Sequence, residues 1–139
     1  MVKTAMFERS RTKMRFSNED MDFMFLWILG YHTYGGASIG ELFSAASKVE
    51  DGNPESWTVA FGDLGTQLKK QAEQLEATGK TAGVPQAFLR AFAGYRAAAQ
   101  MMNPKTDFPR FSQVVAEFRA CFEKAREGFD YPCEPIQVP

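Results

Sequence analysis

Apolar side chains recur at intervals of three and four residues along three long segments of the chain. These segments begin near Pro54, Val84 and Asp107. The spacing places the apolar side chains of each segment on one face of an α-helix. Each segment is roughly 20 residues long and a short turn joins it to the next, so we expect antiparallel neighbours. The pattern therefore predicts an all-α fold.

Two shorter helices are predicted before these segments, which gives an antiparallel bundle of about five helices. The first begins at Ser17 or Asn18, and acidic residues in its first turn suit the helix dipole. Its body, residues 21–30, is apolar on almost every side. A helix without a polar face is normally buried on most sides. We therefore expect another domain or another subunit to pack against it.

A turn at Gly35 and Gly36 leads into the second short helix, because glycine adopts positive φ without steric cost. Ser38 and Glu41 have the spacing of a capping box, in which serine hydroxyl and glutamate carboxylate each bond a backbone N–H. Asn53, which precedes a proline, is the expected N-cap of the long helix that follows.

Two glycines, Gly62 and Gly65, lie inside this long predicted helix. Each costs about 1 kcal/mol relative to alanine in a helix interior. We therefore expect a close helix crossing or a kink there. Trp57, near the start of the same helix, is expected to pack in the core.

The composition is that of an ordinary folded domain, with 45% hydrophobic and 24% charged residues among 139. The formal net charge of −1 gives no field that favours nucleic acid or an anionic membrane. The longest apolar run is shorter than the ~20 residues of a membrane span. Cys121 and Cys133 form no disulfide framework, and Cys121 is expected to be a buried free thiol. These features favour a reducing compartment, and we expect the cytoplasm.

We divide the chain into an extended N-terminal arm (residues 1–16), a helical domain (residues 17–128) and a proline-rich tail (residues 129–139). The three prolines of the tail forbid a helix. Residues 136–138 have the pattern of a β-strand. The tail is therefore expected to be extended and to end in a strand.

The sequence contains no recognisable catalytic motif. It has no Gly-x-Ser-x-Gly nucleophile elbow, no glycine-rich phosphate loop and no cluster with metal-ligand spacing. His32 is the single histidine, and no serine or cysteine has the setting of a nucleophile beside it. We expect no cofactor and no metal, and the chain alone is not expected to be an enzyme.

Three motifs resemble the N-terminal helical region of one group of α/β hydrolases. They are Gly-Gly-Ala-x-Ile-Gly-Glu at residues 35–41, Asp-Gly-Asn-Pro-Glu-Ser-Trp at residues 51–57, and Leu-Arg-Ala with Tyr-Arg-Ala-Ala at residues 89–98. This group includes pseudooxynicotine hydrolase and fungal hydrolases that process polyketides. The resemblance implies a cap over the active site of a serine-type hydrolase domain, on the same or a separate chain. It also implies that the tail, residues 129–139, leads toward this catalytic domain, which is missing from the sequence.

A cap of this kind shapes the pocket and excludes water above a nucleophile that lies elsewhere. Aromatic side chains would stack on an aromatic or polyketide-like substrate, and phenol, imidazole or guanidinium groups would bind its oxygens. The candidate substrate-binding residues are Trp27, Tyr31, His32, Tyr34, Tyr95 and Arg96. Arg90 and Arg96 could instead bridge to a carboxylate such as Glu41.

Two other interpretations remain open from the sequence. The chain could be a stand-alone interaction protein that forms a homodimer through its apolar first helix. It could also be a small catalyst that uses His32 for proton transfer in a cavity lined by some of its 13 phenylalanines.

Overall fold

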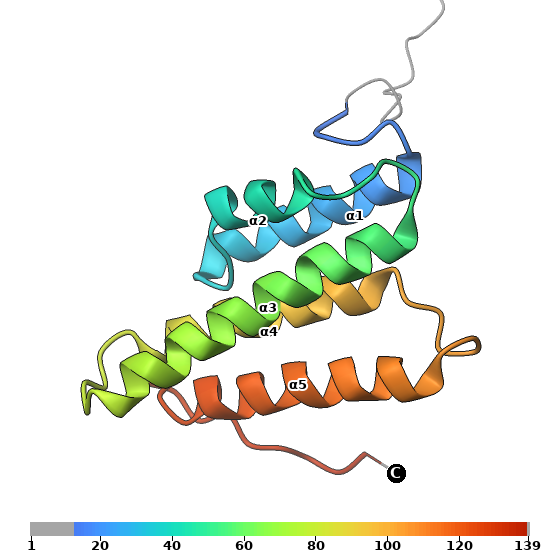
Figure 1. Cartoon of the computed structure of the whole chain (residues 1–139). Coiled ribbons are helices and arrows are strands. Elements are labelled where there is room, and N and C mark those ends of the chain that lie inside the picture. The colour runs from blue at the N-terminus through green and yellow to red at the C-terminus, as the bar shows by residue number, and fades with distance from the viewer. Residues whose placement is uncertain (1–12, 139) are drawn as a thin grey trace, which may run out of the picture.

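The computed structural model describes residues 13–138, which form five α-helices and one 3₁₀-helix (Figure 1). The described residues contain no β-strand. In chain order the helices are α1 (Glu19–Leu29), η2 (Gly30–Tyr34), α2 (Ile39–Ala46), α3 (Pro54–Ala77), α4 (Val84–Gln100) and α5 (Phe108–Arg126). The predicted all-α bundle of about five helices is confirmed. The arm predicted for residues 1–16 lies mostly outside the described part of the chain.

Side-chain caps fix the starts of three helices at the predicted positions. Asn18, Asn53 and Asp107 each accept a hydrogen bond from a backbone N–H in the first turn of α1, α3 and α5. These bonds satisfy donors that have no partner within the helix.

The capping box predicted for α2 is wrong. Ser38 is the N-cap residue, but its side chain makes no capping hydrogen bond. The Glu41 carboxylate forms a two-contact ion pair with Arg90 of α4, whose Nε lies 3.0 Å from Oε2. A carboxylate held by guanidinium on a neighbouring helix does not reach back to its own N-cap. A contact between distant segments has overridden the local motif.

α4 packs against both α3 and α5 (Figure 1). Trp57 and Phe61, early in α3, share one hydrophobic cluster with Ala97, late in α4. Leu68, later in α3, shares a second cluster with Phe88, early in α4. The two helices therefore run antiparallel, as predicted.

α3 and α4 cross closely at Gly65 and Gly94. A Cβ atom on Gly94 would lie 2.7 Å from the Cα of Gly65, and one on Gly65 would lie 2.8 Å from the backbone nitrogen of Tyr95. These distances leave no room for a side chain at either position. The close crossing predicted from the glycines of α3 is confirmed at Gly65.

Trp57 is fully buried, as predicted, and its Nε1–H donates to the Ala97 carbonyl at 2.8 Å. This carbonyl lies in the last turn of α4, where carbonyl groups have no partner within the helix. The indole thus fills the core and completes the end of a second helix.

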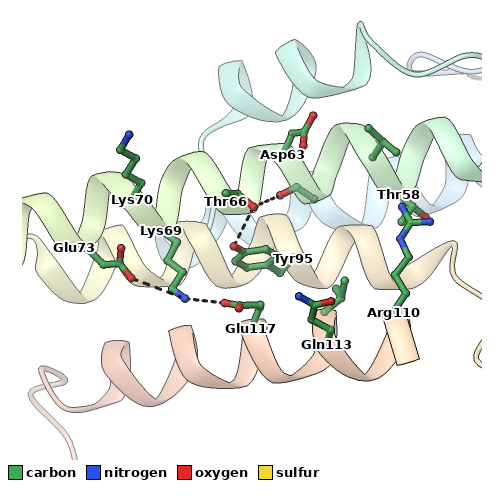
Figure 2. A pocket seen from close by; sticks show the side chains of 13 residues that line it. Thr58, Asp63, Thr66, Lys69, Lys70, Glu73, Tyr95, Arg110, Gln113 and Glu117 are labelled. Atoms are coloured by element: carbon green, nitrogen blue, oxygen red, sulfur yellow. Dashed lines mark hydrogen bonds and ion pairs between the residues drawn. The ribbon is translucent and has the colours of Figure 1, made fainter. Parts of the chain in front are cut away.

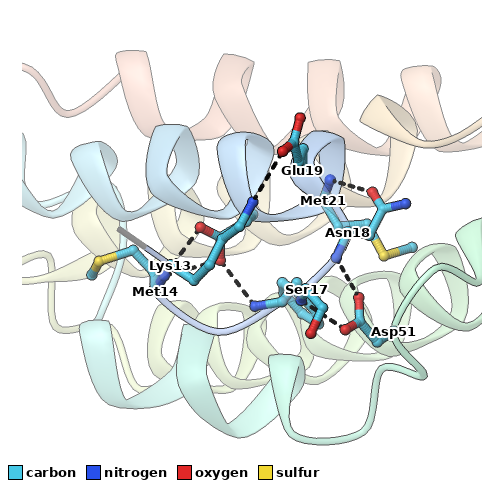
Figure 3. Close-up of polar contacts among 9 residues, drawn as sticks. Lys13, Met14, Ser17, Asn18, Glu19, Met21 and Asp51 are labelled. Carbon is cyan, nitrogen blue, oxygen red and sulfur yellow. Dashed lines mark hydrogen bonds and ion pairs between the residues drawn. The ribbon is translucent and has the colours of Figure 1, made fainter. Parts of the chain in front are cut away.

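Two aspartates fasten the chain segment before α1 (Figure 3). The Asp22 carboxylate accepts backbone N–H groups of Met14, Arg15 and Phe16 at 2.8–3.1 Å. Asp51, in the turn before α3, accepts those of Ser17 and Asn18 at 2.7 and 2.9 Å. The Phe16 ring is consequently buried in the core.

α1 buries only one side of its apolar surface. Met21, Phe25 and Ile28 are in the core, whereas Leu26 and Trp27 are 42% and 54% exposed. A further body that packs on this outer side remains a prediction. No helix within residues 13–138 is long and apolar enough to cross a membrane.

The tail after α5 has no regular secondary structure as far as residue 138. Ile136 and Val138 are more than four-fifths exposed. A β-strand needs a neighbouring strand for its backbone hydrogen bonds, and residues 13–138 offer none. The strand predicted at residues 136–138 is not formed within the described chain.

Candidate functional site

A pocket of about 420 Å³ opens between the α1–η2 region, the middle of α4 and the end of α5 with its tail. We call it the aromatic pocket, because seven of its lining residues carry aromatic rings. It is lined by Trp27, Tyr31, Tyr34, Gly36, Leu89, Phe92, Ala93, Arg96, Phe122, Phe129, Tyr131 and Cys133. Four of the six predicted substrate-binding residues are in this set: Trp27, Tyr31, Tyr34 and Arg96.

The first wall comes from the turn at the end of α1. There the chain tightens into η2 and reverses at Gly35, which has a φ of 73°. Gly36 sits against Tyr31, since a Cβ on this glycine would lie 3.2 Å from the Tyr31 carbonyl oxygen. The reversal leaves Tyr34 70% exposed, with its ring centroid 6.5 Å from that of Tyr31.

The opposite wall is a continuous series of aromatic contacts. Phe92 of α4 lies 5.5 Å from Phe122 of α5, measured between ring centroids. Phe122 lies 6.2 Å from Phe129, and Phe129 stacks on Tyr131 at 5.1 Å. Offset and edge-on ring pairs of this kind add stability beyond the apolar area that they bury. The tail is thereby bound to the bundle.

A hydrogen bond holds the tail further along. Arg126, in the last turn of α5, donates from Nη1 to the Cys133 carbonyl at 2.8 Å. Cys133 itself lines the aromatic pocket. The segment from Phe129 to Cys133 is therefore a structural wall of the pocket.

Arg96 and Tyr31 carry two of the polar groups in the lining. Arg96 is the one charged residue among the described residues that line the pocket, and its guanidinium makes no hydrogen bond or ion pair within residues 13–138. Tyr31 is 9% exposed, and its hydroxyl is buried without a hydrogen-bond partner in the same range. Arg96 is exposed to solvent, but buried polar groups are normally paired, so the Tyr31 hydroxyl is an exception to be explained.

His32 lies outside the aromatic pocket. Its side chain is exposed, and Nδ1 lies 3.1 Å from the Ala37 carbonyl oxygen. A carbonyl only accepts, so Nδ1 carries the proton of this bond. The contact closes the glycine turn locally, and the binding role predicted for His32 remains a prediction.

Tyr95 faces a different site, a polar groove of about 610 Å³ between α3 and α5 (Figure 2). Its hydroxyl donates to Thr66 Oγ1 at 3.1 Å, and burial raises the pKa of this phenol. Lys69 lies 2.8 Å from Glu117 and 3.9 Å from Glu73, and its hydrogen bond to Glu117 raises the pKa of the ammonium. Lys69 and the two glutamates pair with one another, so we interpret the polar groove as a solvated contact between helices.

The described residues present no catalytic constellation. No three His, Cys, Asp or Glu side chains in residues 13–138 come together as a metal site would require. Cys121 is buried and free, as predicted, and burial raises its pKa to about 11. Such a thiol is almost entirely protonated near neutral pH and is a poor nucleophile. What the aromatic pocket can do is bind.

No motif identified Phe92, Phe122, Phe129 and Tyr131 as pocket residues in advance. The first two lie on the apolar stripes of predicted helices, where core packing is the ordinary expectation. The unusual number of phenylalanines, 13 in 139 residues, was the available signal.

No family model matches the chain. It is 31% identical over 127 residues to hydrolase ORFZ of Pyricularia oryzae, and 36% identical over 110 residues to alpha/beta hydrolase psoB of Aspergillus fumigatus. It is also 28% identical over 124 residues to 20-hydroxy-prefusarin hydrolase FUS2 of Gibberella moniliformis. These alignments cover 89%, 75% and 89% of the chain, but only 30%, 25% and 30% of the respective relatives.

The fold and the comparisons define the chain as a helical body similar to part of fungal α/β hydrolases. The resemblance to this group that the sequence motifs indicated is confirmed. The chain spans less than a third of the length of these curated relatives.

Proposed function

We propose that this chain is the helical cap of an α/β-hydrolase-type enzyme that cleaves a C–C or ester bond of an aromatic or polyketide-derived metabolite. A serine-type catalytic domain would follow the tail or bind as a separate chain. In this proposal the aromatic pocket is the part of the substrate site that the cap supplies.

One observation carries the proposal. Trp27, Tyr31, Tyr34 and Arg96 are separated by up to 69 positions in the sequence, yet they line one pocket. The pocket is concave and mainly apolar with few polar groups, which is typical of small-molecule sites. Similarity to part of several fungal hydrolases supports assigning that site to a hydrolase.

The roles follow from the chemistry of each side chain. Exposed aromatic faces of Trp27 and Tyr34 would stack on a flat substrate, and Arg96 would bind one of its oxygens. The cap would also exclude water from the reacting bond. Tyr95 and His32, which lie elsewhere, enter the proposal only as residues that hold the cap in shape.

The intact mass of the natural gene product, with the coding sequence read past Pro139, tests this proposal. We expect a following domain with a Gly-x-Ser-x-Gly motif, whose serine-to-alanine variant loses turnover by several orders of magnitude. A product that ends at Pro139 and has no hydrolase partner would contradict the proposal.

A second candidate is a homodimer formed through α1. The exposed outer side of this helix, which includes Leu26 and Trp27, favours it. A 139-residue natural product that sediments as a dimer would support this candidate over the cap.

A further inference from the structure

Arg96 differs from the other arginine that the sequence singled out on α4. Arg90 is occupied by Glu41 through two contacts. Arg96 lines the aromatic pocket, has no partner within residues 13–138, and faces a described lining that contains no carboxylate. A guanidinium stays charged at any pH that the protein meets. Within the described part of the chain, the pocket lining therefore presents one positive charge without a counter-charge, among aromatic rings.

We infer that the aromatic pocket selects flat, conjugated ligands that carry an ionised oxygen, and that Arg96 is the residue that recognises this charge. Suitable groups are a carboxylate, a phenolate or the enolate of a dicarbonyl compound. The inference deepens the proposed function, on which it rests for taking this pocket as a substrate site.

Charge complementarity supports this class of ligand. A guanidinium bonds two oxygens of a planar anion side by side, and such charge-assisted hydrogen bonds are stronger than neutral ones. Arg96 is exposed to solvent in the free protein. A ligand that covers the apolar lining beside it would exclude water from the contact and so increase the difference between an anion and a neutral analogue. A cationic ligand would meet repulsion from Arg96, and a non-aromatic anion would leave the rings without a partner.

The shape of the pocket supports the aromatic half of the ligand. Trp27, Tyr34 and Tyr131 are 54%, 70% and 60% exposed, so each offers a ring surface for stacking. They come from the α1–η2 region and from the tail, with Arg96 on α4 as a third side. A flat molecule between these walls would place an oxygen substituent toward the guanidinium.

The test measures the binding of two probes to the full 139-residue chain by isothermal titration calorimetry at neutral pH. Naphthoate is ionised under these conditions, and naphthamide is its neutral isostere. We expect naphthoate to bind about tenfold more tightly, the factor expected from one charge-assisted contact. Arg96→Gln should remove this preference without weakening naphthamide, and Arg96→Lys should restore part of it. Lys105→Gln, in the exposed loop after α4, removes the same charge and should leave the preference intact.

Equal affinity for the two probes, an absence of naphthoate binding, or an unchanged preference in Arg96→Gln would each overturn the inference. None of these results bears on whether a hydrolase domain follows Pro139. Conversely, a natural product without that domain would remove the proposed reaction but leave an Arg96-dependent preference for naphthoate intact.

Discussion

Asp22 shows how one carboxylate organises a neighbouring chain segment. It is 6% exposed and accepts three consecutive backbone N–H groups, from Met14, Arg15 and Phe16. Burial alone would raise the pKa of Asp22, but these hydrogen bonds outweigh it and hold the pKa below its ordinary value of 3.8. A lowered carboxyl pKa in the folded state means that the ionised form stabilises the fold.

We expect Asp22→Asn to lower the free energy of unfolding by about 2 kcal/mol, because hydrogen bonds to a charged acceptor are lost. The contribution of Asp22 is fully present above the pKa of the unfolded chain and disappears as pH falls through the lower pKa of the folded state. The free energy of unfolding, measured with urea between neutral pH and about pH 2, should therefore fall less steeply with decreasing pH in the variant than in the parent protein. Asp20→Asn, at an exposed position of the same helix, is the control. Parallel pH profiles for Asp22→Asn and the parent would contradict this account.

The pair α3 and α4 shows what decides the packing between elements. Both helices have apolar stripes, but their separation is set at Gly65 and Gly94, where backbone meets backbone. The close approach brings Trp57 within reach of a carbonyl of α4 at one end. It also places Tyr95 beside Thr66 near the middle. One small residue on each helix thus determines which longer side chains meet.

We expect Gly65→Ala to reduce stability by about 2 kcal/mol, because its Cβ would overlap the backbone of α4 and force the helices apart. Gly62→Ala is the matched control one turn earlier, where a Cβ would lie 3.9 Å from the Ala98 Cβ. That variant should gain up to about 1 kcal/mol from its higher helix propensity. Thermal unfolding followed by circular dichroism measures both, and similar melting temperatures for the two variants would refute the close crossing.

At the scale of the whole molecule, the bundle and the tail form the aromatic pocket together. The bundle supplies Phe92 and Phe122, and the tail adds Phe129 and Tyr131. Among the described tail residues, Phe129 alone packs against the hydrophobic cluster between α3, α4 and α5. The tail is therefore expected to matter more for binding than for folding.

A variant truncated after Gly128 tests this division. We expect it to keep its helical circular dichroism spectrum and cooperative unfolding, with a loss of about 1 kcal/mol from the Phe122–Phe129 ring pair. Naphthoate affinity should fall by about tenfold, since one wall of the pocket is removed. Unchanged affinity would show that the tail is not part of the binding site.

Much of the fold was predictable because helix starts and apolar periodicity are local properties. Asn18, Asn53 and Asp107 act on donors within three residues of themselves, so their roles follow from the sequence around them. The prediction of a capping box at Ser38 was wrong because the Glu41 carboxylate forms an ion pair with Arg90, about 50 positions later. The residues around Ser38 give no information about a partner so distant in the sequence.

The candidate site was only partly predictable for a related reason. Tyr95 and Arg96 are neighbours on α4 and were both predicted to bind substrate, but successive helical residues point about 100° apart. Tyr95 consequently faces the polar groove and Arg96 the aromatic pocket. Likewise, Tyr31 lines the pocket while His32 closes a turn.

The sequence by itself determined the all-α class, the helix boundaries, the burial of Trp57 and the resemblance to α/β hydrolases, because short-range spacing and capping encode them. Only the tertiary structure decided which face of each helix meets which neighbour. Those faces are fixed by the rotation and crossing of helices far apart in the chain, and the glycine contact between α3 and α4 is one such determinant. The aromatic pocket, its tail wall and the place of Arg96 in its lining arise from that arrangement.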